Sequence, residues 1–267
     1  MTQINARKAI AALEVAMQLF ALNDSAVLGA QMAGHLGVDL SLHEERGFED
    51  GEHKIRPLVS VRGHDVFVLH SLHGGPVESA NDKLCKLLFY LSTLRDNGAS
   101  RVTALVPYLA YSRKDRQTKP RDPVTSRYVA QLFEAAGADC VVTLDVHNIV
   151  AFQNAYRCRT VHLDTHKLLA RNLQDKLPTG PVAVMSPDSG GVKRAQLFRE
   201  MLEKILAGPV GQAFVDKRRS SGVVSGDLLV GDVQGATVVV IDDLIASGGT
   251  MARAAKAAFE NGAKRVI

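Results

Sequence analysis

Two aspartates and a glycine-rich turn follow the most apolar segment near the end of the chain. Residues 238–241 read VVVI, Asp242 and Asp243 come next, and the turn Ser247-Gly248-Gly249-Thr250 follows. Carboxylates at the end of a strand offer acceptors for ribose hydroxyls, and a glycine-rich turn at a helix start presents backbone amides to a phosphate. The alternative is that the turn only starts a helix and the aspartates only cap it. No Gly-Lys-Ser/Thr follows, so the segment is not a Walker A loop.

Two basic clusters have the chemistry to hold a polyphosphate. Arg113 and Lys114 open a stretch in which Arg116, Lys119 and Arg121 follow, and Lys217, Arg218 and Arg219 are consecutive. The second cluster follows a predicted strand and precedes the Ser/Gly-rich stretch SSGVVSGD, which we expect to move. A mobile basic loop suits closure over a transferring phosphoryl group, because it neutralises spread charge and excludes water. The alternative for both clusters is a solvated cationic surface.

Acidic and histidine side chains supply further candidates. In FEDGE, Phe48 offers a flat face, and Asp50 and Glu52 can accept hydrogen bonds from amino and hydroxyl groups. An ordinary acidic hairpin turn is the alternative for this segment. His147 follows Asp145 just beyond an apolar strand, so we expect its imidazole at the carboxyl edge of a sheet, where α/β proteins bind ligands.

The elements that must position these residues alternate along the chain. Short apolar runs alternate with stretches typical of helices such as 82–97 and 123–137, which predicts α/β units with a parallel sheet. The predicted strands cover residues 17–22, 65–71, 101–107, 140–146, 182–188, 212–218 and 236–243.

Length and punctuation predict two domains. The chain has 267 residues, enough for two domains of roughly 130 residues each. We expect a helical extension over 1–16, a first domain over 17–164 and a second over 165–267. Residues 264–267 read as the start of a buried strand, so we expect the second domain to be truncated.

Composition excludes several classes of protein. The net charge of +4 and the 5% aromatic content without tryptophan do not favour a single-strand nucleic-acid binder. No apolar run approaches the roughly 20 residues that a membrane span needs. Three widely spaced cysteines without a CxxC pair indicate neither zinc nor redox chemistry, and they favour the reducing cytoplasm.

Several segments together carry a resemblance to a known family. The segment from 238 onward looks like the phosphoribosyl-diphosphate loop of the type I phosphoribosyltransferase fold. With the other segments, in the same order and spacing, the chain resembles the ribose-phosphate diphosphokinases from about residue 17 to its end. These segments are GFEDGEHKIR at 47–56, VPYLAYSRKDRQTKPRDPVTSRYVAQLFEAAGAD at 106–139, LDVHN at 144–148, SPDSGGVKRA at 186–195 and VDKRR at 215–219.

The resemblance implies a fold, a reaction and partners. It implies two type I phosphoribosyltransferase-like domains, each a mainly parallel sheet flanked by helices. The implied reaction transfers the β,γ-diphosphate of ATP to the C1 hydroxyl of ribose 5-phosphate and yields 5-phosphoribosyl 1-diphosphate (PRPP) and AMP for nucleotide biosynthesis. The implied cofactor is Mg²⁺, phosphate and ADP are the implied effectors, and the implied assembly is a homo-oligomer whose nucleotide site a neighbouring subunit completes.

The resemblance also assigns a role to each group of candidate residues. Lys217 and Arg219 would stabilise the transferring group, and His147 and Asp188 would lie around magnesium. The nucleotide would contact Phe48, Asp50, Glu52, Arg113 and Lys114, whereas ribose 5-phosphate would contact Asp242, Asp243, Ser247, Gly248, Gly249 and Thr250.

Some positions depart from the family pattern and keep two other functions open. Ala246 stands where the phosphate loop commonly has aspartate, Lys114 where glutamine is usual, and Thr118 where some members carry a carboxylate. The stretch after His147 also departs from the usual pattern. One alternative is a catalytically weak homologue that binds nucleotide and ribose phosphate and regulates a partner. The other is a base-using phosphoribosyltransferase, which does not account for FEDGE or the DKRR segment.

Overall fold

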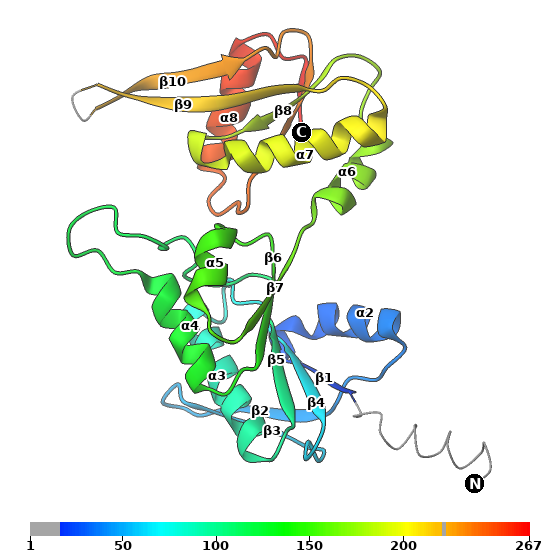
Figure 1. Cartoon of the computed structure of the whole chain (residues 1–267), viewed down its shortest axis with the longest axis vertical. Coiled ribbons are helices and arrows are strands. Elements are labelled where there is room, and N and C mark those ends of the chain that lie inside the picture. The colour runs from blue at the N-terminus through cyan, green and yellow to red at the C-terminus, as the bar shows by residue number, and fades with distance from the viewer. Residues whose placement is uncertain (1–16, 221–222) are drawn as a thin grey trace. The chain divides into compact units, whose positions relative to one another are not determined.

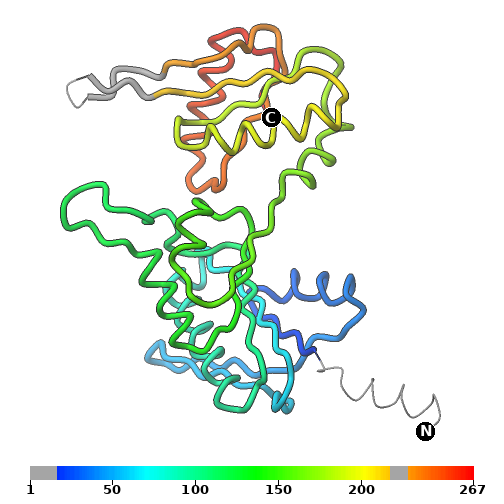
Figure 2. Tube along the Cα trace, viewed as in Figure 1, coloured from blue at the N-terminus to red at the C-terminus, as the bar shows by residue number. Residues whose placement is uncertain are grey.

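A computed structural model describes residues 17–220 and 223–267, except for the side chains of 217–220 and 223–227 (Figure 2). The helical extension expected over 1–16 lies outside the described residues. The chain divides into two compact units, and the division falls between Leu163 and Asp164. Each unit is built around its own sheet and its own buried core.

The first unit contains a five-stranded parallel sheet in the order β1-β4-β5-β6-β7. Buried valine, leucine and alanine side chains explain why these short runs form strands, since both faces of a parallel sheet are usually covered. The strands are β1 (Met17–Ala21), β4 (Asp65–Leu69), β5 (Arg101–Leu105), β6 (Cys140–Leu144) and β7 (Arg159–Leu163).

Helices cover this first sheet on both sides. In Figure 1, α3, α4 and α5 lie on one side of the strands and α2 on the other. Ser79 caps α3, where its hydroxyl accepts from the amide of Asp82 while the Asp82 carboxylate accepts from the amide of Ser79. Tyr90 and Leu94 of α3 are fully buried in the core. The helices are α2 (Ala26–Leu36), α3 (Ala80–Asp96), α4 (Thr125–Ala135) and α5 (Ile149–Ala155), with a 3₁₀ turn η1 at Asn23–Ser25.

A hairpin of the first unit, β2 (His43–Gly47) and β3 (His53–Pro57), lies between α2 and β4 in the chain and forms its own two-stranded sheet. Two contacts dock it on α3: the Lys86 ammonium lies 3.1 Å from the Glu45 carboxylate, and the rings of His53 and Phe89 stack with centroids 5.5 Å apart. The hairpin therefore has a defined position on the body of its unit.

The second unit contains a five-stranded sheet in the order β10-β9-β8-β11-β12. All neighbouring strands are parallel except β10, which runs antiparallel to β9. The strands are β8 (Val182–Ser186), β9 (Gly211–Ser220), β10 (Val223–Gly231), β11 (Thr237–Val240) and β12 (Arg265–Val266); the helices are α6 (His166–Gln174), α7 (Val192–Leu206) and α8 (Gly249–Glu260), with a 3₁₀ turn η2 at Ser189–Gly191.

The basic segment at 217–219 corrects one expectation. We expected it to follow a strand and to lead into a loop, but β9 continues to Ser220 and residues from Val223 onward pair back as β10. The physical reason is that β9 and β10 pair through their backbones. This pairing extends both strands through residues whose polarity is typical of a loop. Lys217 and Arg219 therefore belong to a two-stranded arm.

The α/β fold class with two mainly parallel sheets flanked by helices is confirmed. Strands β2, β3, β7 and β10 were not predicted. Among the described residues, none of the helices combines the length and apolar character that crossing a bilayer requires.

Candidate functional site

In the second unit, Asp242 and Asp243 come one residue after the end of β11, where the sequence predicted carboxylates at a strand end. The backbone amide of Asp243 donates to Oδ1 of Asp242 at 2.9 Å, which holds the Asp242 carboxylate against the backbone of the next residue. Arg194 of α7, which sequence reasoning missed, places Nη1 3.0 Å from Asp243 Oδ1 and 4.0 Å from Asp242 Oδ1. The pair is thus a pre-formed acceptor site with one cation beside it.

The surroundings of Asp242 disfavour its ionised form. Partial burial, followed by its contact with Asp243, raises the pKa of Asp242 to about 6, and the negative charge of Asp188 acts in the same direction. Burial disfavours the charged form, and a neighbouring carboxylate adds repulsion. A carboxylate kept at this cost in a folded protein is typical of a binding or catalytic site.

We expect Asp242→Asn to stabilise the ligand-free protein at neutral pH. The folded-state pKa of about 6 exceeds the ordinary 3.8, so the stability that protonated Asp242 provides is present below pH 3.8 and is lost as pH rises through 6. Removing the charge should therefore raise the melting temperature by roughly 2–4 °C at pH 8, corresponding to about 1 kcal/mol.

Thermal melts of Asp242→Asn and of the wild-type protein between pH 5 and pH 8 measure this effect. The gain should grow with pH, whereas Asp175→Asn, at an exposed position after α6, should show no such trend. A difference between Asp242→Asn and wild type that stays constant over this pH range would contradict the assigned origin.

The turn after the acidic pair leads into α8. Gly248, the N-cap residue, has φ of +75°, a left-handed conformation that favours glycine. Gly249 and Thr250 begin the helix, and Arg253, another residue that sequence reasoning missed, donates from Nη2 to the Thr250 hydroxyl at 3.3 Å. A helix N-terminus with a cation that reaches back to its first turn is suited to an anion such as a phosphate.

Asp188 lies just beyond β8, at the start of the 3₁₀ turn that precedes α7. Its Oδ1 accepts from the amides of Gly190 and Gly191 at 2.9 and 3.2 Å, which fixes the direction of the carboxylate. The Ser186 hydroxyl donates to the Asp188 carbonyl at 2.6 Å. A single oriented carboxylate fits Mg²⁺, which usually takes one or two protein carboxylates together with water and substrate phosphates.

His147, the other predicted magnesium ligand, belongs to the first unit and is exposed in the segment between β6 and α5. Asp145 has a φ of +36°, which is uncommon for a residue with a side chain, and its amide donates to Leu163 of β7 at 3.1 Å. Such conformations cost energy and cluster at functional sites. The histidine therefore follows a strained strand end, as expected for a residue placed for chemistry.

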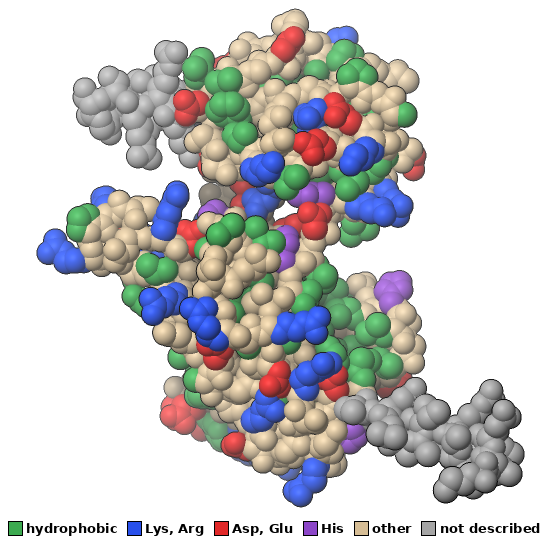
Figure 3. All heavy atoms as spheres, in the orientation of Figure 1, with side chains coloured by type: hydrophobic (Ala, Val, Ile, Leu, Met, Phe, Trp, Pro, Cys, Tyr) green, Lys and Arg blue, Asp and Glu red, His purple; other side chains and the backbone are tan. Residues whose placement is uncertain are grey.

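The basic loop of the first unit lies between β5 and α4 and carries several Lys and Arg side chains on its outer surface (Figure 3). Arg113 is exposed, whereas Lys114 donates to Oδ2 of Asp122 at 2.6 Å. Hydrogen bonds from Lys114 and Thr118 hold the pKa of Asp122 well below its usual range. Asp122, which was not predicted from the sequence, thus holds the two ends of the loop together.

The FEDGE segment forms the turn of the β2–β3 hairpin. The amide of Phe48 donates to the Glu52 carbonyl at 2.8 Å, and the amide of Glu52 donates to Asp50 Oδ1 at 3.0 Å. The Phe48 side chain is 41% exposed, with the Arg46 guanidinium 5.2 Å from its ring centre. The turn of this hairpin therefore presents an aromatic face and exposed carboxylates.

The predicted catalytic residues Lys217 and Arg219 have a described backbone only. Within the register of β9 and β10, Lys217 pairs with Asp227 and Arg219 with Val224. Their side chains lie outside the described residues, so their assigned role stays a prediction.

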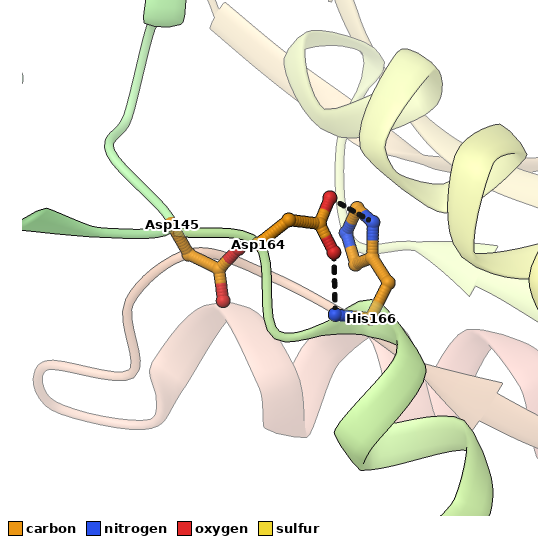
Figure 4. A group of neighbouring side chains, drawn as sticks. All are labelled: Asp145, Asp164 and His166. Carbon is orange, nitrogen blue, oxygen red and sulfur yellow. Dashed lines mark hydrogen bonds and ion pairs between the residues drawn. The ribbon is translucent and has the colours of Figure 1, made fainter. Parts of the chain in front are cut away.

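Asp164 and His166 at the start of the second unit are further residues that the sequence analysis left unassigned. Asp164 accepts from the His166 amide at 2.8 Å, and its other oxygen lies 2.9 Å from His166 Nδ1 (Figure 4). His166 packs its ring against Phe198 of α7. These contacts anchor the first turn of α6.

Comparison with known proteins covers nearly the whole chain. A family model described as the N-terminal domain of ribose phosphate pyrophosphokinase matches residues 17–137, and one described as a phosphoribosyl transferase domain matches residues 161–267. The ribose-phosphate pyrophosphokinase of Caldanaerobacter subterraneus is 38% identical over 251 residues, which are 94% of this chain and 76% of that protein.

Two further relatives agree. The ribose-phosphate pyrophosphokinase of Agrobacterium fabrum is 38% identical over 94% of this chain and 77% of its own length. The crystal structure of phosphoribosylpyrophosphate synthetase from Mycobacterium smegmatis superposes with a TM-score of 0.83 at 36% identity, covering 94% of this chain and 78% of that one.

Proposed function

The chain belongs to the ribose-phosphate pyrophosphokinase family, and on that premise we propose how its residues divide the work of the reaction. The protein is a ribose-phosphate diphosphokinase that produces PRPP from ATP and ribose 5-phosphate. In this reaction the C1 hydroxyl oxygen of ribose 5-phosphate bonds to the β-phosphorus. The bond from that phosphorus to the α,β-bridging oxygen breaks, the hydroxyl loses its proton, and AMP leaves.

The observation that carries the proposal is the acidic pair beside the glycine turn in the second unit. Asp242 and Asp243 would accept from the ribose hydroxyls, and the amides and hydroxyls of Ser247, Gly248, Gly249 and Thr250 would hold the 5-phosphate. Arg194 fixes one carboxylate at 3.0 Å, and Arg253 adds positive charge at the turn. The contacts of Arg194 and Arg253 hold Asp243 and Thr250 in place before a sugar phosphate binds, which lowers the ordering cost of binding.

The first unit would bind the nucleotide. Phe48 offers a stacking face, and Asp50 and Glu52 offer acceptors for amino and hydroxyl groups on the rigid turn. Arg113 and Lys114 would contact the phosphates, with Lys114 exchanging its bond to Asp122 for one to the nucleotide. The short hydrogen bond between Lys114 and Asp122 supports this role because it shows that the ammonium already attracts an anion.

Magnesium would be held by Asp188 and His147, with the donor phosphates and water as its other ligands. When bound, the ion would supply positive charge that neutralises phosphate oxygens. The Lys217 and Arg219 positions on the β9–β10 arm would neutralise the charge that develops between AMP and the transferring diphosphate. We assign none of the described residues as a general base. In this proposal, catalysis therefore comes from positioning and electrostatic stabilisation.

We further propose a homo-oligomer in the cytoplasm, with phosphate and ADP as effectors. Cys85, Cys140 and Cys158 are all free, which supports a reducing compartment. A neighbouring subunit would complete the nucleotide site.

Protection from heat by pairs of ligands tests the function. An ATP analogue whose α,β-bridge cannot be cleaved, with Mg²⁺ and ribose 5-phosphate, should raise the melting temperature more than the analogue or ribose 5-phosphate alone, because ligands that bind only the native state stabilise it. PRPP with a purine or pyrimidine base should protect no better than PRPP alone. Stronger protection by PRPP with a base would favour a base-using transferase instead.

A further inference from the structure

Asn148 links two segments to which the proposed function assigns different tasks. It follows His147 directly and comes before α5, and the hydrogen-bond partners of its side chain belong to the first unit. Its Nδ2 donates to Oδ2 of Asp115 at 2.7 Å, and Asp115 follows Lys114 in the basic loop. One side chain therefore joins the histidine segment to the loop that carries Arg113 and Lys114.

The other end of the same amide is also engaged. Oδ1 of Asn148 accepts from the amides of Val150 and Ala151, both at 3.1 Å, and so caps the first turn of α5. The amide oxygen accepts from the helix and the NH₂ group donates to the loop. These partners therefore determine which way the amide is oriented. The side chain cannot turn away from the loop without losing its cap.

A pocket lies beside this contact, lined on the loop side by Ser112 and on the helix side by Ala151 and Phe152, and Asn148 is part of its wall. The lining is largely apolar, so its contacts with the loop are weak and non-directional. The hydrogen bond from Asn148 to the Asp115 carboxylate is by contrast a strong and directional restraint.

We propose that Asn148 is a positioning residue that holds the nucleotide-binding loop in register with His147. It touches neither substrate nor metal in this proposal and acts through Asp115 on the backbone of Arg113 and Lys114. This inference rests on the proposed function, because it takes Arg113 and Lys114 as nucleotide contacts. Its expected consequence is pre-organisation: the backbone that carries Arg113 and Lys114 is already ordered when Mg-ATP arrives.

An exchange of donor and acceptor tests the link without removing the helix cap. Asp is as good an N-cap as Asn, so Asn148→Asp should keep α5 folded while setting a second carboxylate against Asp115. We expect the dissociation constant for Mg-ATP to rise about tenfold or more, as for a lost hydrogen bond to a charged group. Asp115→Asn combined with Asn148→Asp restores a donor and an acceptor in reversed order and should return the constant to within about threefold of wild type.

Isothermal titration calorimetry with Mg-ATP alone makes the test independent of turnover. Circular dichroism melts of each variant check the fold, and the dissociation constant for ribose 5-phosphate should stay within twofold of wild type in all of them. Unchanged Mg-ATP affinity in Asn148→Asp would overturn the proposal, as would a double variant no better than Asn148→Asp. A wild-type protein that binds both substrates but forms no PRPP would overturn the proposed function instead, while the Mg-ATP affinities still decide the role of Asn148.

Discussion

Asp243→Asn is expected to lower kcat/KM for ribose 5-phosphate roughly 10- to 150-fold, the range for losing a hydrogen bond to a charged group. Asp243 is half-buried and contacts Arg194, so the substitution removes an acceptor for a ribose hydroxyl and leaves the guanidinium without its carboxylate at 3.0 Å. An amide oxygen is a weaker acceptor, and its NH₂ group faces the cation unfavourably. Steady-state assays at saturating Mg-ATP measure the effect.

Two comparisons make this result specific. The KM for Mg-ATP should change by less than about threefold, because the first unit supplies the proposed nucleotide contacts. Asp175→Asn, which removes an exposed carboxylate of the same unit, should behave as wild type. A kcat/KM for ribose 5-phosphate within twofold of the wild-type value would refute the assignment of Asp243 to the ribose hydroxyls.

Lys217→Ala should lower kcat by a factor on the order of 100 to 1,000, the loss typical when one preorganised charge on a transition state is removed. The KM values for both substrates should change little, because the interaction forms mainly as the bridging bond breaks. Arg219→Ala should behave in the same way. Rapid-quench measurement of AMP release separates this chemical step from product release.

Arg218→Ala is the matched control for the same arm. Successive positions of a strand belong to opposite faces, so 217 and 219 share one face of β9 while 218 belongs to the other. The control loses an equal charge from the same strand, and its kcat should stay within about threefold of wild type. An equal loss in all three variants would mean that the net charge of the arm matters and not two particular residues.

The fold could be predicted from the sequence where apolar periodicity is strong. In strands such as β4, β8 and β11 most residues are valine or other apolar residues and most are buried, and these strands were expected near their observed bounds. Strand β7, with the sequence RTVHL, contains arginine and histidine and was missed. Strand β10 includes serine and glycine, a composition that predicts a loop, and it is a strand because it pairs with β9.

The candidate site was predictable where the residues are neighbours in the chain. The acidic pair and the glycine turn lie within nine positions, so their chemistry can be interpreted directly. The contact of Arg194 with Asp243 spans 49 positions, and that of Asn148 with Asp115 spans 33. Such pairs depend on which strands become neighbours in the sheet, and a local pattern contains no information about that order.

Phosphorus NMR of the protein with Mg-ATP and ribose 5-phosphate tests the central claim most directly. Spectra recorded with and without added phosphate, and with EDTA as the metal-free control, follow every phosphorus-containing product at once. We predict that PRPP and AMP appear in equal amounts, that no ADP accumulates, and that EDTA stops the reaction. ATP consumption that yields ADP and phosphate, or no PRPP in a protein that binds both substrates, would contradict the account.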